Sequence, residues 1–159
     1  MSKKTVSSNI KTLVANNKRG YFDYHIEEKI EAGIVLKGTE VKSMRCGKIS
    51  LNDAHVEEID GELYITGFSI PEYDKASLFN HYPKRPKKLL LNRKEVKQIM
   101  GLIQRKGYTA IALQVYFNQR NLIKVEIGLA RGKKQHDKRE AIKQREWDRQ
   151  KNRAVKENR

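Results

Sequence analysis

The stretch YTAIALQVYFNQRNLIKVEIGL, residues 108–129, predicts an antiparallel hairpin. Its two arms, residues 108–117 and 122–129, flank the polar turn NQRN. In the second arm the apolar residues Val125 and Ile127 alternate with charged ones, and a period of two is typical of a strand that buries one face. This stretch therefore indicates a fold built on antiparallel strands.

Two further segments extend the strand pattern. Residues 21–36 predict a half-buried strand, because Phe22, Tyr24 and Ile26 alternate with polar residues. Residues 49–70 predict a second hairpin around an Asp-Gly pair, which is a strong signal for a two-residue turn.

Two short helices are expected between the strands. The first is predicted over residues 40–45, with Thr39 as its N-cap and Gly47 as its stop. The second begins after the predicted N-cap Asn92 and ends at Gly107. Its apolar stripe consists of Val96, Ile99, Met100 and Ile103. Residues 71–88, which hold all three prolines, are predicted to form a loop.

These elements favour a mainly β fold with short helices. Several short antiparallel strands within residues 21–130 predict a closed β-barrel of the oligonucleotide-binding type, followed by a basic C-terminal tail. A split α+β sheet fits the same pattern less well.

Positive charge is concentrated at the two ends of the chain. Residues 1–20 carry five basic and no acidic residues, and residues 131–159 carry twelve basic against five acidic. Residues 21–130 are nearly balanced, with seventeen against fourteen. We therefore expect a loosely ordered basic arm, a folded RNA-binding domain and a basic tail. The tail has too few large apolar side chains to bury a stripe, so it should be disordered alone and fold only against a partner.

A helical tail would align six residues along one side: Lys138, Ile142, Arg145, Arg149, Arg153 and Lys156. Five of the six are basic. This geometry suits the phosphates of an RNA channel and is poor for docking on the core of the protein itself.

Several classes of protein are excluded by what the sequence lacks. Cys46 is the only cysteine, which rules out an intramolecular disulfide and favours a reducing compartment. No apolar run is long enough to span a membrane, and the basic start lacks the apolar segment of a signal peptide. A cytoplasmic protein is therefore expected.

No catalytic or metal-binding motif is recognisable. The chain has no phosphate-binding glycine loop, no dinucleotide fingerprint and no paired-cysteine or His-Glu-x-x-His metal motif. Glu95-Val96-Lys97 resembles a fragment of a nuclease signature, but it lies on the second helix, where Glu95 is placed for capping. We expect no enzymatic activity, no metal and no cofactor.

Three features favour RNA binding. Residues 84–97 hold seven basic side chains, enough for several phosphate contacts. Residues 132–139 concentrate charge where the domain meets the tail, which fits RNA contact and a generic charged helix start equally well. Six aromatic residues on the predicted strands could stack on bases, although most are expected in the core: Phe22, Tyr24, Tyr64, Phe68, Tyr116 and Phe117.

Four sequence blocks resemble the small protein B family, the SsrA-binding proteins that partner tmRNA in bacterial trans-translation. The blocks are EAG at residues 31–33, GTEVKSMR at residues 38–45, KLLLN at residues 88–92 and GLARGKKQHDKR at residues 128–139. They follow the family's order, and Asn17-Lys-Arg19 also matches. The resemblance covers most of the chain and is specific in combination, although no single block is.

The resemblance implies an oligonucleotide-binding-type barrel that grips the tRNA-like domain of tmRNA. It also implies a complex with elongation factor Tu and GTP, which carries alanylated tmRNA to stalled ribosomes for ribosome rescue and peptide tagging. The family's tail, unstructured when free, is implied to form a helix against small-subunit rRNA in the decoding centre and the empty mRNA channel.

Two sets of site residues are carried over from the resemblance. The tmRNA-binding set is Tyr24, Glu31, Leu90, Asn92 and Lys124. The decoding-centre and tail set is Gly132, Lys133, Lys134, His136, Asp137, Lys138, Arg139 and Trp147. Phe22 and His55 differ from the residues common in the family at these positions, so both stay outside the two sets.

Two other classes of protein stay open at this point. One is a ribosomal or RNA-chaperone protein that binds structured RNA without preference for tmRNA. The other is a nuclease.

Overall fold

The structure is a computed structural model that describes residues 11–76, 79–133 and 135–157. The strands are β1 (Thr12–Asn16), β2 (Tyr24–Ile34), β3 (His55–Ile59), β4 (Glu62–Thr66), β5 (Lys87–Leu90), β6 (Tyr108–Phe117) and β7 (Ile123–Gly132). The helices are α1 (Lys18–Asp23), α2 (Gly38–Arg45), α3 (Arg93–Ile103) and α4 (Gln135–Glu157).

The seven strands form one antiparallel sheet whose hydrogen bonding is ring-like. The strand order is β1-β6-β3-β4-β5-β2-β7, and β6 also pairs with β7. Strand β7 pairs with β2 from Gly132 to Lys124 and with β6 from Arg131 to Ile123, so almost its whole length is bonded on both edges. This arrangement confirms the prediction of a mainly antiparallel β fold with few helices.

The core lies where the strands and α3 pack together. It includes the fully buried side chains of Ile65, Phe68, Ile99, Val115, Val125 and Ile127. The stripe predicted on the second helix is confirmed, because Ile99 is buried and the other three members pack against the core. Helix α3 ends at Ile103, short of the predicted Gly107.

Both predicted hairpins are confirmed. Strands β3 and β4 join through Asp60 and Gly61, whose φ angles are 51° and 78°, as a two-residue hairpin turn requires. Strands β6 and β7 form the hairpin predicted from residues 108–129, although β7 extends to Gly132.

Residues 12–23 are more ordered than the sequence predicted, and residues 1–10 of the predicted arm lie outside the described residues. Residues 12–16, assigned to a loose arm, form β1 and pair with β6. Residues 18–23 form α1, so the strand predicted over 21–36 begins only at Tyr24. Asn17 explains the difference: its side chain accepts a hydrogen bond from the Gly20 N–H and donates one to the carbonyl of Ala112, at 2.9 Å each. This cap depends on a contact with a residue 95 positions away.

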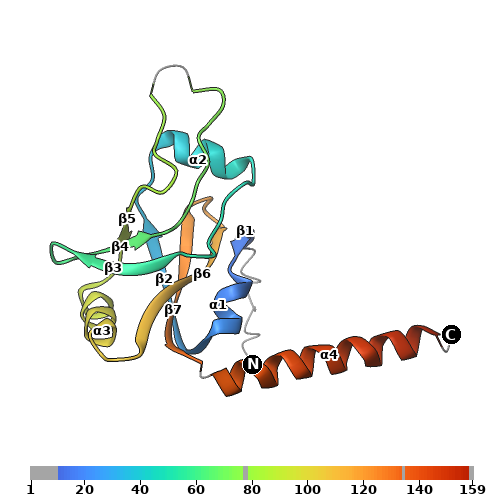
Figure 1. The fold of residues 1–159 in the computed structure, drawn as a ribbon. Coiled ribbons are helices and arrows are strands. Elements are labelled where there is room, and N and C mark those ends of the chain that lie inside the picture. The colour runs from blue at the N-terminus through green and yellow to red at the C-terminus, as the bar shows by residue number, and fades with distance from the viewer. Residues whose placement is uncertain (1–10, 77–78, 134, 158–159) are drawn as a thin grey trace, which may run out of the picture.

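Helix α2 and the proline-rich loop also differ from the prediction. Helix α2 begins at Gly38, and Glu40, not Thr39, satisfies its first turn by accepting from the Lys37 N–H at 2.8 Å. The predicted loop over residues 71–88 is shorter, because β5 begins at Lys87. Figure 1 shows α2 and this loop at one end of the long strands and α4 extending away from the other end.

Gly67 should be the glycine least tolerant of a side chain. It has a φ of +73°, and a Cβ there would lie 2.2 Å from the carbonyl oxygen of Asp53. Gly61 is a matched control, with a φ of +78° and no heavy atom within 4 Å of its Cβ position. Gly61→Ala should lower the free energy of unfolding by about 1–2 kcal/mol from backbone strain alone. Gly67→Ala should lower it further in urea titrations, and equal losses would contradict this reading.

Candidate RNA-binding surface

A groove crosses the sheet at Gly33. Gly33 of β2 lies opposite Leu90 of β5 and opposite Lys124 of β7, and directly opposed residues of antiparallel strands point to the same face. Gly33 has no side chain, and a Cβ there would lie 3.2 Å from Leu90 Cβ, so glycine lets Leu90 lie close over this strand. These residues line a groove of about 340 Å³. Leu90, 54% exposed, is an apolar wall of this groove.

A second groove of about 380 Å³ adjoins the first. Lys124 lines both grooves, and Glu31 lines the second together with Lys11 and the β6–β7 turn. Glu31 lies two residues before Gly33 on β2, so the side chains of these two positions share a face. The structure therefore brings Glu31, Leu90 and Lys124, three members of the tmRNA-binding set, onto one surface.

The carboxylate of Glu31 is held by two neighbours. The Tyr116 hydroxyl donates a hydrogen bond to Glu31 Oε2, and Lys11 Nζ lies 4.0 Å from the same oxygen. Lys11 also lies over the Tyr116 ring, 4.4 Å from its centroid. Burial and the adjacent Glu31 carboxylate raise the pKa of Tyr116 well above its usual value, so its hydroxyl stays a donor. Glu31 itself remains exposed.

Two of the aromatic residues considered for base stacking are unavailable. Tyr116 is 1% exposed and Phe68 is fully buried. The sequence pattern could not separate these two from the half-buried Tyr24, Tyr64 and Phe117.

Asn92 and Tyr24 lie apart from the groove. Asn92 is exposed at the N-cap of α3, and its N–H donates to Glu95 Oε2 at 3.0 Å, so its predicted capping position is confirmed. Tyr24 begins β2, seven residues from Glu31, which is roughly 23 Å along a strand. It lies opposite Gly132 and lines a separate pocket of about 450 Å³.

The pocket at Tyr24 holds His55, one of the two departures from the family pattern. The His55 ring contacts Asp53 O at 3.0 Å, Glu57 Oε1 at 2.6 Å and Thr66 Oγ1 at 3.1 Å. Burial lowers the pKa of His55, but the hydrogen bonds and charges of Asp53 and Glu57 outweigh burial and leave the pKa above its ordinary value. The ring is thus fixed in place and half-buried.

Phe22, the other departure, joins the domain to the tail. Arg145 of α4 lies over the Phe22 ring at 4.9 Å from its centroid, and Lys133 Nζ lies at 6.0 Å. Lys138 Nζ is 3.5 Å from Asp23 Oδ1 on the same helix α1. Lys138 and Arg145 belong to the basic side predicted for the tail helix. The first turns of that side therefore contact α1, although its basic residues predicted poor docking on the protein itself.

Those remaining decoding-centre and tail residues that the structure describes lie at this junction or along α4. Gly132 ends β7, and Lys133 donates from its backbone N–H to Asp23 O at 3.0 Å. Arg139 is exposed and Trp147 is 58% exposed. Lys134 lies outside the described residues; His136 and Asp137 belong to α4, but their side chains are not described.

Only part of the basic stretch at residues 84–97 is available to phosphates. Lys87 is fully buried, Arg85 Nη2 lies 2.5 Å from Glu40 Oε1, and Lys88 Nζ lies 2.8 Å from Glu62 Oε1. Three of the seven basic side chains predicted to supply several phosphate contacts are therefore buried or held in ion pairs. The exposed members are Lys84, Arg93, Lys94 and Lys97.

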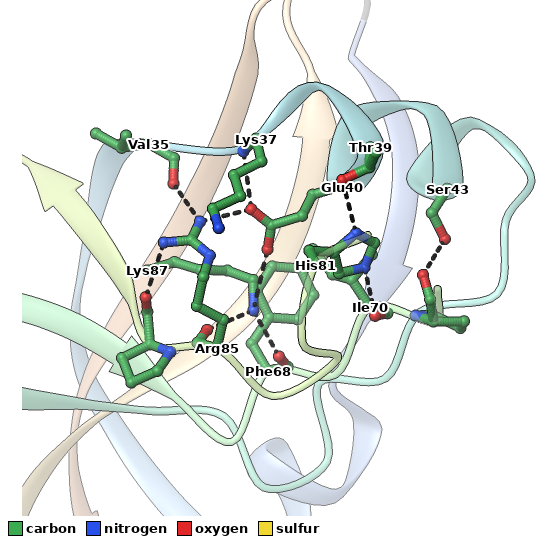
Figure 2. Close-up of polar contacts among 12 residues, drawn as sticks. Val35, Lys37, Thr39, Glu40, Ser43, Phe68, Ile70, His81, Arg85 and Lys87 are labelled. Carbon is green, nitrogen blue, oxygen red and sulfur yellow. Dashed lines mark hydrogen bonds and ion pairs between the residues drawn. The ribbon is translucent and has the colours of Figure 1, made fainter. Parts of the chain in front are cut away.

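Lys87 and Arg85 surround the buried carboxylate of Glu40 (Figure 2). Burial raises the pKa of Glu40, but hydrogen bonds from Arg85 and the Lys37 N–H outweigh burial and leave the pKa below its usual value. Lys87 Nζ lies 3.7 Å from Glu40 Oε2 and donates to Phe68 O at 2.9 Å and Arg85 O at 2.7 Å. Burial lowers the pKa of Lys87 to about 8. This cluster ties the end of the proline-rich loop to α2.

Together, an apolar wall, a cation and an oriented acid line the two adjoining grooves, which makes this surface a candidate for nucleic-acid binding. Among the described residues, no group of three or more His, Cys, Asp or Glu side chains could hold a metal ion. In the part of the chain that the structure covers, no helix is both long and apolar enough to cross a membrane.

Comparison with known proteins gives the family. Residues 14–157 match the family described as "SmpB protein". The SsrA-binding proteins of Rickettsia peacockii and Rickettsia felis are each 50% identical over 147 residues, which cover 92% of this chain and 97% of theirs. A solved structure described as "tmRNA-SmpB: a journey to the center of the bacterial ribosome" has a TM-score of 0.65 and 44% identity, covering 80% of this chain and 93% of that one.

The chain belongs to the SmpB family, the family of small protein B. The family assignment confirms the resemblance read from the sequence and the expectation that the chain is not an enzyme.

The buried Lys87 should make stability depend on pH. Its pKa is about 8 in the folded chain against 10.5 ordinarily, so between these values the unfolded chain binds more protons than the folded one. Stability rises with pH wherever the unfolded state binds more protons. From pH 8 to about pH 10, the free energy of unfolding should therefore rise by on the order of 1–2 kcal/mol relative to Lys87→Met. Chemical denaturation across this range measures the difference, and a flat or falling difference would contradict it.

Proposed function

We propose that this chain binds the tRNA-like domain of tmRNA and delivers it to stalled ribosomes in trans-translation. The relatives named SsrA-binding protein support the identity of the RNA. The single observation that carries the proposal is the surface that gathers Glu31, Leu90 and Lys124 around two adjoining grooves.

Each of the three side chains has a distinct role in this proposal. Lys124 contacts phosphate, and the exposed Leu90 packs against sugar or base. A carboxylate cannot contact phosphate favourably, so Glu31 accepts hydrogen bonds from base edges or ribose hydroxyls. Tyr116 orients Glu31 by binding one of its oxygens, which leaves the other free for RNA.

We further propose that the ring-like sheet is a closed oligonucleotide-binding-type barrel. The pairing of β6 with β7, together with the chain of pairs from β6 through β3, β4 and β5 to β2, supports closure. Tyr24 and Asn92, which line neither groove, then extend the RNA contact beyond them.

The tail is proposed to act on the ribosome as part of a complex with elongation factor Tu and GTP in the cytoplasm. Residues 132–139 would occupy the decoding centre, and the rest of α4, including Trp147, the empty mRNA channel. The exposure of Ile142, Trp147 and Val155, at 46%, 58% and 60%, supports order that depends on a partner, because the helix buries little apolar surface.

Tyr116 should affect RNA binding only through Glu31. Glu31→Ala should weaken binding of the tRNA-like domain at every salt concentration, and Tyr116→Phe should weaken it by about tenfold, or ~1.4 kcal/mol. In the Glu31→Ala background, Tyr116→Phe should have no further effect. A filter-binding double-mutant cycle measures this coupling. Additive losses would show that Tyr116 acts independently of Glu31, and tighter binding by Glu31→Ala would refute the role of the acid.

The domain and the tail should have separable functions. Deleting residues 135–159 leaves intact both β7 and the hydrogen bond from the Lys133 N–H to Asp23 O of α1. The affinity for tmRNA should therefore stay within about tenfold. Peptide tagging should be lost, while one RNA species, tmRNA, should dominate the RNA that co-purifies with either protein.

A full-length control tests whether the tail must be helical. Arg145→Pro combined with Arg149→Pro keeps the tail's length and most of its charge but breaks α4. Tagging should fail with tmRNA binding intact.

Broad recovery of ribosomal RNA by the unmodified chain would favour a general RNA-binding protein, and metal-dependent cleavage of the RNA would favour a nuclease.

A further inference from the structure

The loop between β4 and β5 buries a polar side chain and exposes two aromatic ones. In the run Phe79-Asn80-His81-Tyr82, His81 is 1% exposed, whereas Phe79 is 89% and Tyr82 is 70% exposed. Large aromatic side chains normally contribute to burial, and exposed ones are typical of interaction sites. The loop therefore presents two aromatic rings to solvent and directs a histidine inward.

Specific hydrogen bonds hold the loop in this arrangement. His81 Nε2 lies 2.9 Å from Ile70 O, which can only accept, so Nε2 donates. His81 Nδ1 lies 2.9 Å from Thr39 Oγ1, whose hydroxyl donates to it in the neutral ring. The Asn80 side chain accepts from the Tyr73 N–H at 3.1 Å and donates to Tyr73 O at 3.0 Å, joining the two arms of the loop.

The same loop is fastened to α2 at both of its ends (Figure 2). Near the start, Ser43 Oγ donates to Pro71 O at 2.6 Å. Near the end, Arg85 binds Glu40 as described above. A buried ion pair adds little net stability compared with apolar packing, and its best-supported benefit is to select one geometry. Here the selected geometry holds Phe79 and Tyr82 outward in advance of any partner.

Helix α2 connects this loop with the groove. Val41 and Arg45 line the groove, whereas Thr39 and Ser43 hold the loop, so the two lie on different sides of α2. Successive helical residues are 100° apart, and Glu40 and Met44 form the buried side of α2. Lys42 therefore lies on the exposed side, between the side that faces the groove and the side that faces the loop. Lys42 Nζ lies 5.8 Å from the Tyr73 ring centroid on the loop.

The charge along this path is positive. Five exposed cations border it, and none of them forms an ion pair within the part of the chain that the structure describes: Lys42, Arg45, Lys48, Lys75 and Lys84. The exposed acids on the loop are Glu72 and Asp74. Aromatic rings among unpaired cations match RNA, because bases stack on the rings while phosphates contact the cations.

We infer that the loop is a second contact for the RNA that fills the groove, with Phe79 and Tyr82 stacking on unpaired bases after the strand crosses α2 past Arg45 and Lys42. The inference rests on the proposed function, since it takes the groove as the first contact. Continuity through α2 is what favours the same RNA over a separate partner.

Replacing both rings tests the contact. In the full-length chain, Phe79→Ala with Tyr82→Ala should weaken binding of the tRNA-like domain of tmRNA at least tenfold. The slope of log affinity against log salt should stay unchanged, because no charge is removed. Phe79→Trp with Tyr82→Trp should retain affinity, since tryptophan also stacks. Lys42→Ala with Arg45→Ala should reduce the slope, and Ile59→Ala, an exposed apolar residue on the β3–β4 hairpin, is the matched control that should change neither quantity.

The outcomes separate this inference from the proposed function. Normal RNA binding by the double-alanine loop variant, with weakened binding by Glu31→Ala, would overturn the loop contact and leave the groove. Normal binding by both variants would refute the groove as well. Normal RNA binding with loss of tagging by the loop variant would assign the rings to the ribosome or a protein partner and would also overturn the inference.

Discussion

The pairing of β7 with β2 on one edge and β6 on the other is the constraint on which the rest of the structure depends. It makes the sheet's hydrogen bonding ring-like, and it places Lys124 beside Gly33 at one end and Gly132 beside Tyr24 at the other. The alternating Val125 and Ile127 anchor this strand in the core, so their burial holds the proposed RNA contacts in position.

A second constraint acts on the loop and α2, and it is polar. Glu40, Lys87 and His81 are buried with partners from several segments. They fix the connection beyond Ile70, where no apolar side chain of the described residues 71–76 and 79–86 is buried. Such clusters are costly when one partner is removed, because the remaining charge is left buried without compensation. The loop's shape is therefore specified by a few side chains and not by many weak contacts.

The sequence predicted what depends on local chemistry. Strand alternation at Val125 and Ile127, the Asp60-Gly61 turn and the Asn92 cap all rest on residues close together in the chain. Helix α1 was missed because Asn17 caps it through a contact with the distant Ala112. The sequence counted Lys87 among the seven basic side chains of residues 84–97 and could not show its burial beside Glu40. Periodicity likewise could not show that Tyr116 faces Glu31 under Lys11. For the candidate site, resemblance supplied the residue names, and only the fold separated Tyr24 from the groove.

The pairing of β2 with β7 also fixes a distance along the molecule. Lys124 and Gly132 are eight residues apart on a strand bonded along both edges, which sets a span of roughly 26 Å between the groove and the start of the tail. A flexible linker would let the two ends explore many separations, whereas this span cannot change without breaking strand pairing. An RNA bound in the proposed groove would therefore lie at a fixed distance from whatever the tail contacts.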